Sequence, residues 1–307
     1  MGARLKVENY SPANLSLPGA SNGKPGPGNS TVSRSDQSVV PRTVCVLRKF
    51  GFRLSRNHRI LELGCGAGRH VYEFRDAGYE AFRVDLADFV QLRHPVDRAW
   101  FAVSADPDVY RIPFPSKSFD VVTSTATLEH VRLHDATFRE IRRVLNADGV
   151  SLHVFPSKWR PIEPHFRVPF GGGISWEWYY LICAALGFKG ADYHLGQSPR
   201  EQARMNWQFS RTALNYRSRK EIEYFARQAF KNVWFAEKEF VECTRSSSRA
   251  SRVILKLSRI FPPVVIAYRG MHTKAVVLSG YPDQVVRAFG SWKLPSDVIS
   301  SGTGSGK

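Results

Sequence analysis

The sequence predicts a doubly wound α/β fold built on a mostly parallel sheet of seven strands. From about residue 59 onward, short apolar runs with the length of buried strands alternate with amphipathic helical segments. This alternation is typical of parallel sheets that carry helices on both faces. The segment 157–217 breaks the pattern and is too long for a plain connection inside a compact sheet. It predicts an aromatic-rich cap inserted after the fifth strand.

Each element follows from its own local pattern. Strands are expected at 59–64, 79–86, 100–106, 118–126, 150–156, 231–241 and 273–280. Helices are expected at 42–52, 67–78, 135–145, 218–230 and 251–261. Ser218 and Glu221 form a capping-box signature at the start of the fourth of these helices. These signals predict where the elements begin as well as their type.

Composition divides the chain into five parts. Residues 1–40 are poor in large apolar side chains, and we expect a disordered tail there because such a segment cannot bury enough surface to fold. Residues 283–307, which end in Ser-Ser-Gly-Thr-Gly-Ser-Gly-Lys, are expected to form a C-terminal tail. The core of the fold is expected at 41–156, the cap at 157–217 and the C-terminal part of the fold at 218–282.

The chain is strongly basic, with a formal net charge of +17. Residues 200–260 hold 14 Lys and Arg against 6 Asp and Glu, which favours contact with anions, although a solvated basic face explains the excess equally well. The most apolar stretch, 171–188, is interrupted by Glu177 and is too short to span a bilayer. We therefore expect a soluble protein without a transmembrane segment.

The cysteines at 45, 65, 183 and 243 show no Cys-x-x-Cys pair and no spacing to histidine that is typical of zinc sites. This spacing argues against a disulfide framework and predicts no metal site. A reducing cytoplasm is the expected location.

The strongest motif is Leu-Glu-Leu-Gly-Cys-Gly-Ala-Gly at 61–68, between a predicted strand and a predicted helix. Glycines at such a turn let the backbone approach a ligand, which then faces the start of the helix. A dinucleotide fingerprint counted from Gly64 requires a small residue at position 69, but Arg69 stands there. The spacing therefore favours a ligand smaller than a dinucleotide.

This stretch resembles motif I of the class I S-adenosylmethionine-dependent methyltransferases, in particular their type 11-like domain, which has a Rossmann-like fold. The resemblance continues at Asp85, at the end of the second predicted strand, and at Asp106, at the end of the third. It includes the stretch at 111–124 and the Arg-Val-Leu-Asn-Ala-Asp-Gly element at 143–149. It is close over 55–155, whereas after 218 only the order of elements agrees.

The resemblance implies S-adenosylmethionine as the cofactor. The residues that it places against the cofactor are Glu62, Gly64, Cys65, Gly66, Gly68, Asp85, Leu86, Ala105 and Asp106. The three glycines would cradle the methionine part, and Glu62 would orient their loop. Asp85 would hold the ribose, while Asp106 and Ala105 would meet the adenine edge.

Methyl transfer from a sulfonium needs mainly positioning and no metal, but an oxygen or nitrogen acceptor must lose a proton. His130, after the fourth strand, is the first candidate for the general base, and His165, after the fifth, is the second. The segment 124–130 lacks the Asp/Asn-Pro-Pro-Tyr/Phe sequence of amino methyltransferases, and the chain has no Pro-Cys nucleophile. A nucleic-acid base is therefore a disfavoured acceptor.

The sequence thus predicts a methyltransferase that acts on a small-molecule, lipid or glycan acceptor, which the basic surface would allow to be anionic. Methylation of RNA or another acidic macromolecule is one alternative, and a non-catalytic binding protein with this fold is another. Peripheral membrane contact through the basic, apolar segment 251–261 is a further alternative. The acceptor atom and the oligomeric state stay open.

Overall fold

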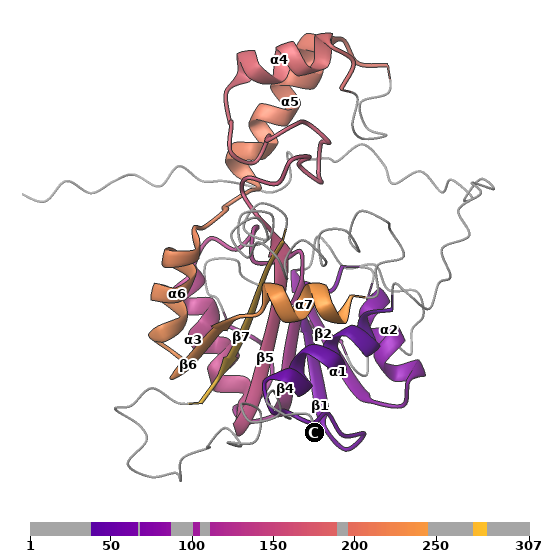
Figure 1. Ribbon diagram of the computed structural model, residues 1–307, viewed down its shortest axis with the longest axis vertical. Coiled ribbons are helices and arrows are strands. Elements are labelled where there is room, and N and C mark those ends of the chain that lie inside the picture. Colours follow the sequence, from indigo (N-terminus) through magenta and orange to yellow (C-terminus); the bar gives the residue numbers. More distant parts are fainter. Residues whose placement is uncertain are drawn as a thin grey trace, which may run out of the picture.

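The computed structural model describes residues 38–66, 68–86, 101–104, 111–188, 196–244 and 273–280. Within these ranges seven strands form one sheet in the order β3-β2-β1-β4-β5-β7-β6 (Figure 1). The strands are β1 Arg59–Leu63, β2 Glu80–Leu86, β3 Phe101–Ser104, β4 Phe119–Thr125, β5 Leu145–Pro156, β6 Asn232–Phe235 and β7 Thr273–Ser279. The predicted α/β class and the mostly parallel sheet are confirmed.

Strands β1 to β5 run parallel, and β7 lies antiparallel between β5 and β6. The chain builds the sheet outward from β1 to β2 and β3, then returns to place β4 on the other side of β1. The order of the strands therefore reverses between β1 and β4. Ligands of open α/β sheets bind outside the carboxyl ends of the strands at this reversal, which is where the predicted motif lies.

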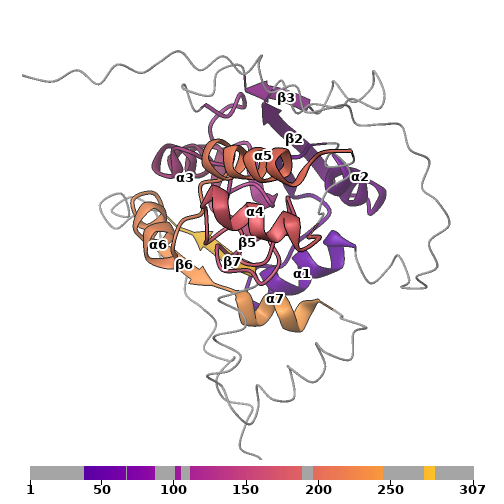
Figure 2. The same ribbon diagram turned by 90° about the horizontal axis from the view of Figure 1, so that it is seen from above.

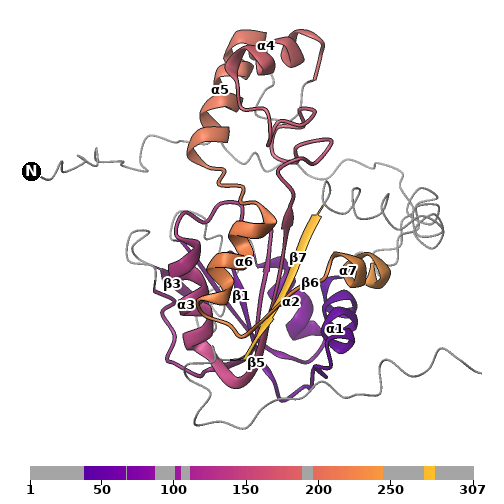
Figure 3. The same cartoon turned by 60° about the vertical axis from the view of Figure 1, so that its left-hand side comes forward.

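Helices cover both faces of the sheet, as Figure 3 shows. The helices of the described residues are α1 Val39–Lys49, α2 Arg69–Asp76, α3 His134–Val144, α4 Glu177–Ala185, α5 Pro199–Thr212, α6 Arg219–Arg227 and α7 Glu237–Cys243. α3 and α6 pack on one face, and α1, α2 and α7 pack on the other. The neighbours Val121 and Val122 of β4 enter these two cores separately, as the alternation of side chains along a strand requires.

The predicted capping box of α6 is present. Glu221 N donates to Ser218 Oγ, and the Glu221 carboxylate accepts from Ser218 N at 2.8 Å. Ser198 and Glu201 form the same arrangement at the start of α5. These reciprocal bonds satisfy backbone donors that a helix otherwise leaves without partners.

The insertion after β5 contains α4 and α5, which stand beyond the end of the sheet where β5 finishes (Figures 1 and 2). It has a small core of its own, built around Phe166, Tyr180 and Ala203. Tyr180 Oη donates to the carbonyl oxygen of Gly171 at 2.7 Å, so the buried hydroxyl has a partner. The interruption of the α/β pattern thus corresponds to a separate packed unit.

One predicted strand is partly wrong. The expected strand at 231–241 ends at Phe235, and α7 follows it. Ala236 N still donates to the carbonyl oxygen of Ala275 on β7, but the chain then turns into a helix whose first turn holds Glu237 and Glu239. Acidic side chains stabilise a helix N-terminus, and this local signal outweighed the strand pattern.

Several predictions concern other parts of the chain. The N-terminal tail up to 37, the helix at 251–261 and the C-terminal tail at 283–307 lie outside the described residues. α1 already begins at Val39, slightly before the expected boundary of the core. Among the described helices, none has the length and apolar character needed to cross a membrane.

The expectation of no disulfide is wrong, because Cys45 and Cys243 are bonded to each other. The two cysteines are separated by 198 residues, and they meet because α1 and α7 pack side by side on one face of the sheet. No spacing rule in the sequence reveals a pair brought together only by the fold. Cys65 and Cys183 are free thiols.

We expect peptide mapping without reductant to recover Cys45 linked to Cys243, while Cys65 and Cys183 react with an alkylating agent after unfolding. Reduction, or Cys45→Ser, should lower the free energy of unfolding by about 2–4 kcal/mol, because the unfolded chain regains entropy. Cys183→Ser is the matched control, and it should leave the linked peptide in place. Alkylation of all four cysteines in the unreduced protein would contradict this pairing.

Candidate functional site

The turn after β1 has left-handed backbone at three glycines. The φ angles are +67° at Gly64, +49° at Gly66 and +75° at Gly68. Residues with a Cβ rarely adopt such angles, so the predicted glycine pattern meets a physical requirement here. Gly66 N donates to Asp85 Oδ2 at 2.6 Å, which joins the turn to the end of β2.

The surroundings of these glycines differ. A Cβ on Gly64 would overlap the side chain of Thr127, and one on Gly68 would overlap the guanidinium of Arg83. A Cβ on Gly66 would meet no atom of the described residues within 4 Å. The backbone at Gly66 therefore borders open space, as a ligand cradle requires, while its two neighbours are packed against side chains.

Glu62 lies beneath this turn and is buried. Thr123 Oγ1 on β4 donates to Glu62 Oε2, and His70 Nδ1 on α2 lies 3.1 Å from Glu62 Oε1. The Glu62 carboxylate thus connects β1 to α2 and to β4, the strand on the other side of the strand-order reversal. This agrees with the predicted task of orienting the loop.

Cys65 is half-buried inside the turn. Burial, reinforced by the nearby charge of Asp85, raises the pKa of its thiol to about 12. The thiol therefore stays protonated at neutral pH, and Cys65 contributes shape to the turn rather than a nucleophile.

The segment after β4 faces the glycine turn from the other side of the reversal. Thr127 Oγ1 donates to the carbonyl oxygen of Leu63 at 3.1 Å, and Ala126 has a φ of +54° while its N–H donates to Val154 O. Left-handed backbone at a residue with a Cβ costs about 1–2 kcal/mol and clusters at binding sites. The segments after β1 and β4 are therefore held in their backbone conformations by contacts that outweigh the φ preferences of the individual residues.

His130 and His165, the two predicted base candidates, lie together although 35 residues separate them. Their Nε2 atoms are 3.2 Å apart, and the rings meet edge to face. His130 Nδ1 lies 2.7 Å from the carbonyl oxygen of Ala213. Burial lowers the pKa of His130 against the opposing effect of that hydrogen bond. The pair lies between the segment after β4 and the segment after β5.

His165 is held by the buried Glu163, whose Oε1 lies 2.6 Å from His165 Nδ1. Tyr216 Oη donates to the same oxygen at 2.9 Å, and the backbone N–H groups of His165 and Phe166 donate to Oε2. Burial alone would raise the pKa of Glu163, but these hydrogen bonds and the charge of His165 hold it below its ordinary value. Glu163 is therefore an ionised anchor for the ring.

Glu129 adds a third group beside the histidines. Its side chain is 1% exposed, and neither carboxylate oxygen has a hydrogen-bond partner among the described residues. Oε1 lies 3.9 Å from His130 Nε2. Burial raises the pKa of this carboxyl to about 7. A buried carboxylate without hydrogen bonds is costly, so its position beside two imidazoles calls for a function.

The same segment is fastened to the end of the cap. Asn215 N donates to the carbonyl oxygen of Glu129 at 2.6 Å, and Asn215 Nδ2 donates to Val131 O at 2.7 Å. Together with the bond from His130 to Ala213, these contacts join the loop after β4 to the chain that returns from α5. The histidine pair therefore lies where core and cap meet.

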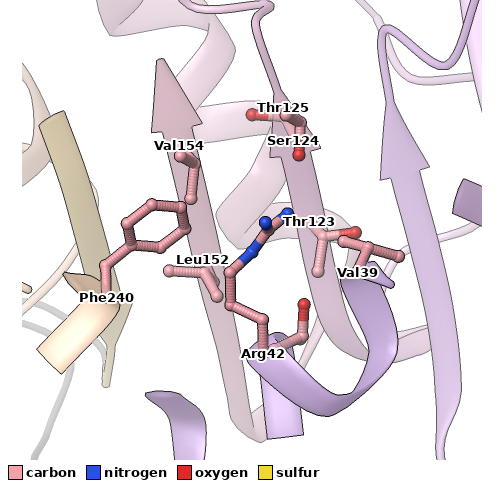
Figure 4. Close-up of a pocket in the computed structure, with 9 residues that line it drawn as sticks. Val39, Arg42, Thr123, Ser124, Thr125, Leu152, Val154 and Phe240 are labelled. Atoms are coloured by element: carbon pink, nitrogen blue, oxygen red, sulfur yellow. The ribbon is translucent and has the colours of Figure 1, made fainter. Parts of the chain in front are cut away.

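A small hollow lies between α1 and the strands β4 and β5 (Figure 4). The guanidinium of Arg42 points there toward Thr123 and Ser124. Burial lowers the pKa of Arg42, against the opposing charge of Glu73. The Arg42 guanidinium is therefore a cation close to β4, whose Thr123 donates to Glu62.

The aromatic residues of the cap divide into two groups. Phe166 is fully buried in the cap core, whereas Trp159, Phe170, Trp176 and Trp178 are each 41–59% exposed. A closed aromatic acceptor pocket is therefore not formed by these side chains together.

The remaining predicted residues have less structural detail. The backbone of Leu86 ends β2, and Ala105 and Asp106 lie outside the described residues. Sequence reasoning missed His70, Arg83, Glu129 and Glu163. Glu129 and Glu163 had a detectable signal, as acidic neighbours of His130 and His165 in the sequence, whereas His70 and Arg83 act through contacts between separate elements.

Comparisons with known proteins agree with this geometry. The family model described as a methyltransferase domain matches residues 61–152. A ubiquinone/menaquinone biosynthesis C-methyltransferase of Cupriavidus necator is 31% identical over 118 residues, covering 36% of this chain and 49% of the relative. An uncharacterised chloroplastic methyltransferase of Arabidopsis thaliana is 25% identical over 141 residues, covering 43% of this chain and 40% of the relative.

Among solved structures, a phosphoethanolamine N-methyltransferase 2 of Haemonchus contortus overlaps 77% of this chain and 51% of its own. Its identity is 17% and the TM-score is 0.41, and an overlap of this size says nothing about ligands. The chain spans about half the length of the curated relatives it matches. The segment 61–152 matches a methyltransferase domain, which confirms the resemblance found in the sequence.

Mutation can distinguish the packed position of Gly64 from the open position of Gly66. Gly66→Ala should cost about 1–2 kcal/mol of stability, the price of left-handed backbone alone. Gly64→Ala should cost about 3 kcal/mol, because the overlap with Thr127 adds to that strain. Denaturant unfolding measures both, and Gly64→Ala combined with Thr127→Ala should recover part of the loss. Equal costs for the two single variants would show that Thr127 does not restrict the turn.

Proposed function

We propose that the protein transfers the methyl group of S-adenosylmethionine to a small-molecule, lipid or glycan acceptor. The observation that carries the proposal is the open glycine turn at the strand-order reversal, bonded from Gly66 to Asp85. This arrangement places the Asp85 carboxylate and the N-terminus of α2 at the point where ligands of such sheets bind.

The residues present fit the cofactor. Gly64, Gly66 and Gly68 would cradle its methionine part, and Glu62 would keep the turn in place through β4 and α2. A carboxylate offers about four acceptor sites, so the bond from Gly66 to Asp85 is compatible with acceptance from ribose hydroxyls as well. Leu86, Ala105 and Asp106 stay predictions for the adenine side, and Cys65 for the shape of the turn.

Bound S-adenosylmethionine supplies an electrophilic methyl group whose bond to sulfur breaks as the bond to the acceptor forms, leaving S-adenosylhomocysteine. The chain's main task is to align the acceptor with that methyl and exclude water. We propose that His130 and His165 mark the acceptor side, because they lie beyond β4 and β5 next to the cap. A role in accepting the acceptor's proton stays a prediction for both.

The acceptor itself is proposed only by class. The basic surface would suit an anionic acceptor. The alternatives of RNA methylation and of binding without catalysis stay predictions, and a steep fall of activity with added salt would favour the first. The membrane alternative depends on 251–261, which lies outside the described residues.

A cytoplasmic location also stays a prediction. The bond between Cys45 and Cys243 weighs against it, because disulfides persist mainly in oxidising compartments.

Asp85→Asn should weaken S-adenosylhomocysteine binding about 10–100-fold, since hydrogen bonds to a charged group contribute about 1.5–3 kcal/mol. Calorimetric titration measures the affinity, and transfer of labelled methyl into acceptor mixtures measures the activity. Glu80→Gln is the matched control on β2, because Glu80 is half-exposed and pairs with Arg59 at the surface. Unchanged affinity in Asp85→Asn, or no binding by the unaltered chain, would refute the proposed function.

A further inference from the structure

We propose that Glu129, His130 and His165 form a binding site for a divalent transition-metal ion, with zinc as the best match. Their donor atoms all lie within 4.8 Å of one another. Two imidazoles and one carboxylate are a ligand set that holds zinc in catalytic sites. No zinc spacing is visible in the sequence because the ligands come from two segments that only the fold joins.

Hydrogen bonds set the proton positions on both rings. A carbonyl oxygen only accepts, so His130 Nδ1 carries the proton that faces Ala213. The ionised Glu163 likewise accepts from His165 Nδ1. With both Nδ1 atoms protonated, the two Nε2 atoms face each other across 3.2 Å, a contact that needs a cation shared between them: either a proton on one Nε2 or a metal ion.

The spacing suits a metal ion. In a tetrahedral zinc site with bonds of about 2.0–2.1 Å, two ligand nitrogens lie about 3.3 Å apart, close to the 3.2 Å between the imidazoles. Glu129 Oε1 is 3.9 Å from His130 Nε2. A movement of about half an ångström, the size of ordinary thermal displacement, brings this oxygen to ligand spacing from His130, and all three donor atoms lie within 4.8 Å of one another.

The environment of Glu129 is a second, independent observation that favours a bound ion. It is 1% exposed, and its oxygens have no hydrogen-bond partner among the described residues. Burial of a carboxylate is unfavourable without a compensating cation or donors. A divalent ion at the two imidazoles would supply that compensation.

The outer contacts also match a metal site. Ligand histidines usually donate their other ring N–H to a carboxylate or a carbonyl, which fixes the ring. His165 has the buried Glu163, itself held by Tyr216, and His130 has the carbonyl of Ala213. Glu163 is therefore a positioning residue for the site.

Imidazole ligands favour zinc and similar transition metals over magnesium or calcium. Three protein ligands leave a coordination position for water or for an oxygen of the methyl acceptor. This last step rests on the proposed function, whereas metal binding itself does not. With the ion bound, the imidazole nitrogens are ligands, and the ion would polarise the acceptor oxygen in place of a histidine base.

Calorimetric titration of the chelator-treated, tag-free full chain with zinc chloride tests the site, with magnesium chloride as the negative control. We expect one zinc ion per chain and no magnesium binding at this site. Glu129→Gln and His165→Asn should each lower zinc affinity at least about 10-fold, and Glu163→Gln about 10–100-fold. His58→Asn, which alters a histidine far from the cluster in sequence and bonded to Ser55, should leave the affinity unchanged.

Cobalt substitution gives a second readout, because tetrahedral coordination by nitrogen and oxygen produces visible absorption bands that Glu129→Gln should alter. Glu129→Gln removes a buried charge, so its thermal stability without metal should be equal or higher, which separates ligand loss from misfolding. Zinc affinity that is the same in Glu129→Gln, His165→Asn and the unaltered chain would overturn the proposal, as would no zinc binding. S-adenosylhomocysteine titrated into the same samples reports on the proposed function separately.

Discussion

The left-handed turn after β1 is the constraint on which the rest of the site depends. Glycine at 64, 66 and 68 lets the backbone adopt φ angles that side chains disfavour, and the N–H of Gly66 then reaches Asp85. Glu62 anchors the turn from below by bonds to β4 and α2. Because β1 and β4 flank the reversal of strand order, a change in this turn would move both edges of the proposed cofactor site at once.

The half of the proposed site that we assign to the cofactor could be predicted because its signals are local. A strand, three glycines and a carboxylate about 20 residues later all appear as sequence spacing, and the fold places them together. Strands and helices were predictable for the same reason, because apolar residues recur along the chain at a spacing that differs between a strand and a helix. The strand expected through 241 failed because helix-favouring acidic residues after Ala236 competed with its pattern.

The half of the proposed site that we assign to the acceptor depends on contacts between distant segments. His130 and His165 were both predicted as candidate bases, but they meet only because the loop after β4 is bonded to the chain returning from the cap. The disulfide was missed for the same physical reason, because helix packing brings its cysteines together. Spacing along the chain carries no information about such pairs.

A crystal structure of the full chain grown with S-adenosylhomocysteine tests the central claim most directly. The account predicts that the amino-acid end of the ligand runs along the backbone at 64–68 and that both ribose hydroxyls face Asp85. A ligand bound elsewhere on the chain, or a ribose that makes no contact with Asp85, would contradict it.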